Sequence, residues 1–289
     1  MAMRSLSRVL FAVAVLLFLF ENFAAAQPTQ QCRLSPASVK LGQTIHLHCP
    51  AGVASATMGS RTIQMFSQSD GTTLGLMPVP VTQKPGDYPI EFLSADKKSL
   101  FTAKAVVLKT YFPSQNVALT AAIEALHSTP DDIHLLTTFR ESVSNDRFWQ
   151  EPLVAPVPGC MTSPFGVKRL HNGKPTGEFH GGVDQRTPEG EPIRAIAAGK
   201  VSFAQKFNVL GNAVGVDHGQ GLESTYMHMS KLAVEPGAQV EKGAILGYAG
   251  ETGRANGPHL HWVMYVNGVN VNAAQWIKLS PCSAPKKHH

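Results

Sequence analysis

The carboxyl-terminal half of the chain carries three short patterns of residues that can bind metal or move protons. The first is His180-Gly181-Gly182-Val183-Asp184, in which an imidazole and a carboxylate lie four positions apart. The second is His259-Leu260-His261, and the third is Tyr226-Met227-His228. Imidazole nitrogens and carboxylate oxygens are both good ligands of zinc. The three patterns together therefore predict a metal site.

The paired histidines have the spacing of one face of a strand. Residues two apart in a strand point to the same side, so His259 and His261 should face one cleft. One imidazole can then bind a metal while the other moves protons; a histidine pair on a solvated sheet face is the alternative. A ligand set of His180, Asp184 and His261 leaves the fourth zinc position open, as catalytic zinc requires. His228 and His259 remain as candidates for proton transfer.

Other kinds of catalytic site find little support in the chain. It contains no His-Glu-x-x-His sequence and no Gly-x-Ser-x-Gly sequence, which argues against a helix-borne glutamate base and a serine nucleophile. His218 lies in the glycine-rich stretch Asp217–Gly221 and is interpreted as a turn residue outside the site. His46 and His48 share one face of a predicted strand, where solvation is more common than metal binding.

Further short motifs surround these histidines. They are Thr162–Gly166, Asn172-Gly173, Pro188–Ala195, Ala198–Val201, Asp217–Gly221, Val240–Gly243 and Gly253–Pro258. Together with the three histidine patterns, they make residues 160–275 resemble the lysostaphin/LytM-type zinc metallopeptidases, the β-lytic endopeptidases of bacterial cell walls. Residues 85–120 are similar to the β domain that precedes the peptidase in some exported members.

The resemblance implies a role for each site residue. It implies that His180, Asp184 and His261 hold Zn²⁺. It also implies that His228 and His259 polarise the attacking water and stabilise the tetrahedral oxyanion, in an order that the sequence leaves open. The family fold is a compact antiparallel β-sheet with an open groove. Gln185-Arg186 and Asn256 depart from the usual pattern, and we expect them to flank the groove and affect substrate preference.

Composition and patterning predict a mostly β chain. The 25 glycines and 20 prolines among 289 residues indicate many turns and short strands. Strands are expected at 44–49, 61–66, 88–92, 103–111, 200–204, 213–217 and 261–266, the last followed by an Asn267-Gly268 hairpin turn and a return over 269–271. We predict a β-sandwich-like domain at 27–111, a linker with a helix at 112–150, an antiparallel peptidase domain at 151–283 and a tail at 284–289.

The linker helix is predicted over 130–143 from its amino-terminal signals. Thr129 suits the cap, Pro130 the first helical position, and the acidic residues after it the positive end of the helix dipole. Ile133, Leu136, Phe139 and Val143 then recur at helical spacing and predict one buried face. No function is assigned to the linker.

Residues 1–26 have the basic start, short apolar run and Ala24-Ala25-Ala26 ending of a secretory signal peptide. Export favours oxidised cysteines, and Cys32–Cys49 with Cys160–Cys282 is the preferred pairing because each pair lies within one domain. Free buried thiols are the alternative. The protein is expected in the periplasm or outside the cell, without stable membrane insertion once the signal is cleaved.

The sequence thus predicts a zinc-dependent endopeptidase that hydrolyses the peptide cross-links of bacterial peptidoglycan. The alternative is a non-catalytic, LytM-like activator of other cell-wall hydrolases, and the presence of all five site residues favours the enzyme. A formal net charge of +5 without a dense Lys/Arg stripe argues against nucleic acid as a partner.

Overall fold

The computed structural model describes residues 31–283. The expected signal peptide at 1–26 and the expected tail at 284–289 lie outside these residues. Within 31–283, no helix is long and apolar enough to cross a membrane.

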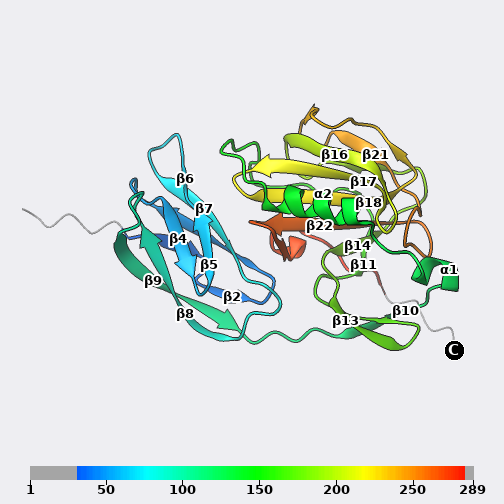
Figure 1. Ribbon diagram of the computed structural model, residues 1–289, viewed down its shortest axis with the longest axis horizontal. Coiled ribbons are helices and arrows are strands. Elements are labelled where there is room, and N and C mark those ends of the chain that lie inside the picture. The colour runs from blue at the N-terminus through cyan, green and yellow to red at the C-terminus, as the bar shows by residue number, and fades with distance from the viewer. Residues whose placement is uncertain (1–30, 284–289) are drawn as a thin grey trace, which may run out of the picture. The chain divides into compact units, whose positions relative to one another are not determined.

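Two β-sheets form the amino-terminal part of the described chain (Figure 1). One sheet has the order β1 (Arg33–Ser35), β3 (Thr44–Cys49), β7 (Thr73–Pro78) and β6 (Phe66–Ser67). The other has the order β2 (Ser38–Lys40), β9 (Ser99–Leu108), β8 (Gly86–Leu93), β4 (Ser55–Met58) and β5 (Arg61–Gln64). Ile45 and Leu47 of the first sheet share one core with Phe92 and Val107 of the second. This shared core confirms the predicted β-sandwich.

The segment that follows the sandwich contributes a strand to the neighbourhood of the candidate site. Strand β10 (Ser114–Val117) pairs in parallel with β12 (Lys168–His171), which pairs in turn with β13 (Lys174–Phe179). A single helical turn, α1 (Ala121–Glu124), comes next. The linking segment is therefore built into a sheet together with residues from the peptidase region.

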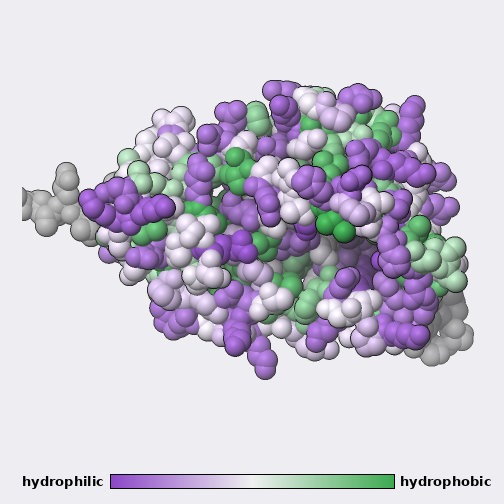
Figure 2. All heavy atoms as spheres, in the orientation of Figure 1, coloured by the Kyte–Doolittle hydropathy of each residue, from purple (hydrophilic) through white to green (hydrophobic). Residues whose placement is uncertain are grey.

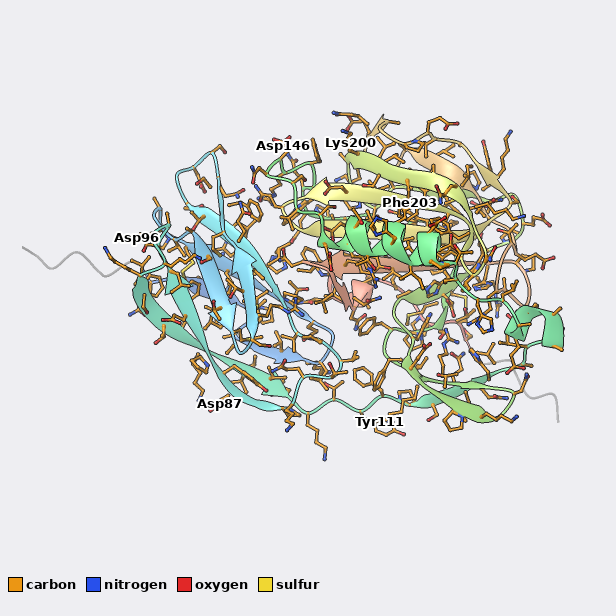
Figure 3. All side chains as sticks on the ribbon, viewed as in Figure 1. Asp87, Asp96, Tyr111, Asp146, Lys200 and Phe203 are labelled. Carbon is orange, nitrogen blue, oxygen red and sulfur yellow. A yellow bond between two sulfur atoms is a disulfide. The ribbon has the colours of Figure 1, made fainter. Side chains whose placement is uncertain are left out.

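Helix α2 (Pro130–Glu141) begins where the sequence predicts it. The Thr129 hydroxyl accepts a hydrogen bond from the Asp132 backbone N–H, and the Asp132 carboxylate accepts one from the Thr129 N–H, which makes a capping box. Phe139 packs edge-on against Phe203, which is labelled next to the helix in Figure 3. The sequence predicts that Ile133 and Val143 belong to the buried face of this helix, and for these two residues the prediction is wrong. Ile133 is 55% exposed, and Val143 lies beyond the end of the helix.

The central element of the peptidase region is an eight-stranded antiparallel sheet. Its order is β11 (Met161–Ser163), β14 (Val183–Arg186), β22 (His259–Val266), β18 (Leu222–Met229), β17 (Gly211–Gly219), β16 (Gly199–Phe207) and β20 (Gln239–Val240), with β23 (Val269–Val271) beside β22. A small sheet follows the order β15 (Pro192–Arg194), β21 (Ile245–Tyr248) and β19 (Lys231–Leu232), and one 3₁₀ turn spans Ala273–Gln275. The predicted fold class, mostly β with an antiparallel carboxyl-terminal sheet, is confirmed.

Apolar side chains on both faces hold this sheet in place. Trp262, Tyr226 and Leu260 belong to the larger core on one face, while Met227, Val263 and Tyr265 pack with the α2 side chains on the other. The face of the molecule seen in Figure 2 is mostly hydrophilic, with hydrophobic residues scattered among the polar ones. Both predicted disulfides, Cys32–Cys49 and Cys160–Cys282, are present.

Candidate metal centre

Two neighbouring strands bring the first and second histidine patterns together. In the β14–β22 ladder, Asp184 lies directly opposite His261. His180 precedes β14 and is fixed by its own backbone, whose N–H donates to Val167 O at 2.8 Å. The two intervening glycines allow the close approach: a Cβ on Gly182 would lie 2.2 Å from the Trp262 carbonyl oxygen.

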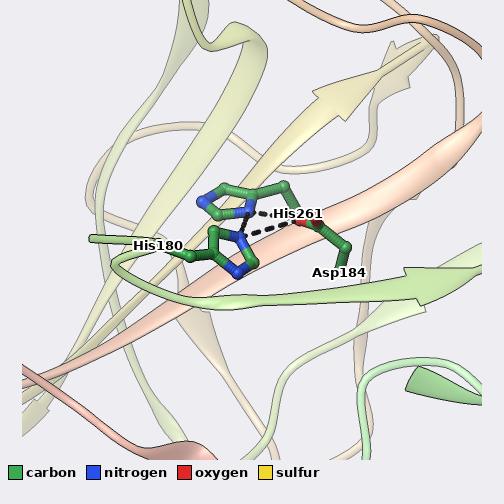
Figure 4. Close-up of side chains that lie close together, drawn as sticks. All are labelled: His180, Asp184 and His261. Atoms are coloured by element: carbon green, nitrogen blue, oxygen red, sulfur yellow. Dashed lines mark hydrogen bonds and ion pairs between the residues drawn. The ribbon is translucent and has the colours of Figure 1, made fainter. Parts of the chain in front are cut away.

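Three ligand atoms converge at this point (Figure 4). The Asp184 Oδ1 atom lies 3.1 Å from His180 Nε2 and 2.6 Å from His261 Nδ1, and the two nitrogens are 3.0 Å apart. Ligand atoms about 2.0–2.1 Å from a tetrahedral zinc ion lie about 3.3 Å from one another. The donor set of two imidazoles and one carboxylate, at nearly this spacing, fits zinc.

The orientation of the His180 ring follows from its outer contact. Its Nδ1 lies 2.9 Å from the Pro164 carbonyl oxygen. A carbonyl can only accept, so Nδ1 carries a proton, and Nε2 is the ring nitrogen that faces Asp184 and His261. A backbone carbonyl behind the ring is the usual way in which metal-binding histidines are oriented.

Asp184 is held as a carboxylate. Burial would raise its pKa, but hydrogen bonds to His180 and His261, together with their charges, outweigh burial and hold the pKa well below its usual range. Its second oxygen, Oδ2, accepts a hydrogen bond from Arg169 Nη2 at 2.8 Å. The two carboxylate oxygens therefore have different tasks: Oδ1 faces the histidines and Oδ2 faces the arginine.

His228 and His259 lie beside this cluster. The His228 ring centroid is 5.0 Å from that of His259 and 6.1 Å from that of His261. A β-bulge between β17 and β18 places His228 at a φ of +61°, and this local twist turns the side chain out of the strand's regular alternation. The structure thus brings all five predicted site residues to one place, while their individual roles stay predictions.

Backbone carbonyls orient both of these rings as well. His228 Nδ1 lies 2.8 Å from Thr252 O, and His259 Nδ1 lies 2.8 Å from Gly257 O. Each Nδ1 therefore carries a proton, and Nε2 is the second nitrogen of each ring. Burial, and then the neighbouring imidazoles, lower the pKa of His228 to about 3, so the ring is neutral near neutral pH.

The five residues line a groove of about 540 Å³. One wall is built from residues 115–119 of the linking segment, and Asn256 lies on the rim as predicted. The sequence alone assigned no function to the linking segment, and the structure shows that its strand β10 lines the groove. Arg169 and Gln115, which line the same groove, were not among the predicted site residues.

Three other predictions have different outcomes. Gln185 does not flank the groove: it is buried, and its amide bonds Gly159 O at 2.7 Å and Trp262 Nε1 at 2.8 Å. His218 lies outside the groove as expected, but at the buried end of strand β17, bonded to Ala198 O and Ser224 Oγ. His46 packs on the Trp276 ring, and among residues 31–283 it joins no group of metal-binding side chains.

Comparison with known proteins places this region in a family. The sequence model of Peptidase family M23 matches residues 178–273, which contain all five histidine and aspartate residues of the cluster and its surroundings. A crystal structure from Pseudomonas aeruginosa described as an M23 peptidase matches with a TM-score of 0.64 and 27% identity, covering 82% of this chain and 93% of that chain. The peptidase region therefore belongs to peptidase family M23.

Two curated relatives are similar over the same region. The DD-carboxypeptidase/endopeptidase Mpg of Neisseria meningitidis serogroup B is 40% identical over 112 residues, or 39% of this chain and 26% of the relative. The peptidoglycan DD-endopeptidase ShyA of Vibrio cholerae is 35% identical over 127 residues, or 44% of this chain and 30% of the relative. The chain thus spans less than a third of the length of these relatives.

Proposed function

We propose that this protein is a zinc-dependent endopeptidase that hydrolyses peptide cross-links of bacterial peptidoglycan. One observation carries the proposal: two imidazole nitrogens and one carboxylate oxygen lie within 3.1 Å of one another in an open groove. The name of the relative ShyA, a peptidoglycan DD-endopeptidase, indicates the substrate class.

The chain's own atoms can be assigned to metal binding. His180 Nε2, Asp184 Oδ1 and His261 Nδ1 would hold the ion, and three protein ligands leave one position open. Zinc in such a site acts as a Lewis acid that polarises the scissile carbonyl and acidifies water. The hydrogen bonds behind His180 and Asp184 keep these two ligand atoms aimed at the same point.

His228 and His259 would move the proton. Because their Nδ1 protons are held by backbone carbonyls, each ring can accept a proton only at Nε2. One ring takes the proton of the attacking water and can then deliver it to the leaving amine. The other ring becomes a donor toward the tetrahedral oxyanion only when its Nε2 is also protonated. The geometry alone is compatible with either division of labour.

The cellular setting follows from the same proposal. Both disulfides belong to an oxidising compartment, which supports export to the periplasm or beyond. Peptidoglycan peptides are then the partner, and no nucleic acid is needed. The complete set of five site residues around one groove favours catalysis over the role of a non-catalytic activator.

The decisive experiment is digestion of purified peptidoglycan by the zinc-loaded protein, with mass analysis of the released peptides. We expect new amino termini at cross-links in the parent protein and none in His180→Ala or Asp184→Ala. His134→Ala is the matched control, because His134 is an exposed residue of α2, away from the groove.

Elemental analysis of the same preparations separates the parts of the proposal. His180→Ala and Asp184→Ala should lose stoichiometric zinc, while His134→Ala keeps it. If the two ligand variants both retained one zinc per chain, the ligand assignment would be wrong. If the parent protein bound zinc but released no peptide from any wall, the non-catalytic alternative would be correct.

A further inference from the structure

One side chain from strand β10 contacts two residues that are themselves hydrogen-bonded to candidate metal ligands. Gln115 Oε1 lies 2.6 Å from Ser163 Oγ and 2.9 Å from Arg169 Nη1. Ser163 Oγ lies 3.2 Å from His180 Nδ1, and Arg169 Nη2 lies 2.8 Å from Asp184 Oδ2. A single amide oxygen thus stands between the outer sides of His180 and Asp184.

The directions of these hydrogen bonds agree with one another. The His180 Nδ1 proton is shared between Pro164 O and Ser163 Oγ, both of which accept. The Ser163 hydroxyl then donates to Gln115 Oε1, which also accepts from the Arg169 guanidinium. An amide oxygen has two lone pairs, so Gln115 Oε1 can accept both bonds at once.

Arg169 links Gln115 to the Asp184 carboxylate. Its guanidinium presents parallel N–H groups in a rigid fork, and here one arm reaches the amide oxygen and the other reaches the carboxylate. The side chains of Arg169 and Asp184 are only 16% and 13% exposed, so little water competes for these bonds. The pair fixes Asp184 Oδ2 and leaves Oδ1 to face the two histidines.

We propose that Gln115 is a positioning residue of the metal centre, acting through Ser163 on His180 and through Arg169 on Asp184. This inference rests on the proposed zinc site. It makes β10 a working part of the metal centre, even though β10 lies before the predicted boundary of the peptidase domain. Docking of the linking strand and zinc affinity are then coupled through one side chain.

The test is zinc affinity in the full-length protein, measured by competition with a chromophoric chelator. Outer partners of metal ligands typically change metal affinity by about 10–100-fold. Gln115→Leu removes the shared acceptor and should weaken zinc binding by about that factor. Gln115→Glu keeps an oxygen that accepts both bonds and should restore the affinity to that of the parent or better. Arg169→Lys, a point charge without the fork, should bind zinc with an intermediate affinity.

A matched control separates positioning from general loosening of the linking segment. The Asn172 side-chain amide accepts a hydrogen bond from the Leu119 backbone N–H and donates one to the Leu119 backbone carbonyl. It makes no hydrogen bond to Gln115, Ser163 or Arg169. Asn172 has a φ of +50°, which glycine adopts without strain, so Asn172→Gly removes these two tethers and the hydrogen bond from Asn172 Nδ2 to Glu124 Oε2. This variant should keep the parental zinc affinity. Thermal unfolding in excess chelator should show that Gln115→Leu is folded.

The outcomes are distinct. Parental zinc affinity in Gln115→Leu, or an equal loss in Asn172→Gly, would overturn the positioning role. Failure of Gln115→Glu to restore affinity would also overturn it, because the shared acceptor would then not be the cause. Absence of zinc binding by the parent protein would instead refute the proposed function itself.

Discussion

Glu223 is a carboxylic acid buried in the middle of the large sheet. It lies on β18, opposite Asp217 of β17 and Tyr265 of β22, and it has no measurable exposure. Neither carboxyl oxygen has a hydrogen-bond partner within residues 31–283. Burial, and then the charge of Asp217, raise its pKa from 4.5 to about 9.

The raised pKa makes stability fall as pH rises. Below pH 4.5 the acid is protonated in both the folded and the unfolded chain, so it does not make the free energy of unfolding depend on pH. Between pH 4.5 and about 9 the unfolded chain loses the proton and the folded chain keeps it, so unfolding becomes more favourable. Each pH unit in this window is worth about 1.4 kcal/mol. Between pH 5 and pH 8 this residue should lower the free energy of unfolding by about 4 kcal/mol.

Glu223→Gln should remove this slope. The free energy of unfolding is measured by urea denaturation at pH 5, 6, 7 and 8, in excess chelator so that metal binding does not contribute. The glutamine leaves buried N–H groups, a penalty of about 1–3 kcal/mol that is the same at every pH. Glu241→Gln, on an exposed turn, is the matched control and should keep the parental slope. Equal slopes in Glu223→Gln and the parent would refute the reasoning.

Three further predictions concern other parts of the chain. Replacing Cys160 and Cys282 by serine opens a loop of 122 residues and should lower the free energy of unfolding by about 2–5 kcal/mol, measured by urea denaturation. Thr129→Ala removes the cap of α2 and should lower it by about 1 kcal/mol, whereas Thr129→Ser should not. His228→Ala and His259→Ala should keep zinc, by elemental analysis, but slow peptidoglycan hydrolysis by about 10²–10⁴-fold. Loss of zinc in His259→Ala would reopen the choice of ligand within the histidine pair.

Rules that consider only neighbouring residues predict the bounds of an element when its own residues set those bounds. Strands β3 and β23 have the predicted bounds, because alternation sets the first and the Asn267-Gly268 turn sets the second. Helix α2 starts at its predicted cap for the same reason. The buried face of α2 was predicted less well. Periodicity shows which residues lie on the same side of the helix, but it does not show how many of them the sheet buries. Leu136 and Phe139 pack inward, while Ile133 stays exposed.

The five site residues could be found from sequence because each lies in a short, recognisable pattern. Gln115 and Arg169 could not, because their contacts join residues that no spacing rule relates. Gln115 and Arg169 are 54 positions apart, and they meet only because β10 pairs in parallel with β12. That pairing depends on the long-range packing of a segment that carries no catalytic pattern of its own.

The position of Gln185 follows from the alternation of side chains along a strand. Successive residues of a strand face opposite sides, so if Asp184 of β14 faces the groove, its neighbour must face away. The structure follows this rule: the Gln185 amide is buried against Gly159 O and accepts the indole N–H of Trp262. An apolar residue here would leave that buried indole donor without its partner, which destabilises a fold by about 1–3 kcal/mol. Glutamine at this position is therefore explained by the packing of β14, whereas Asn256 lines the groove.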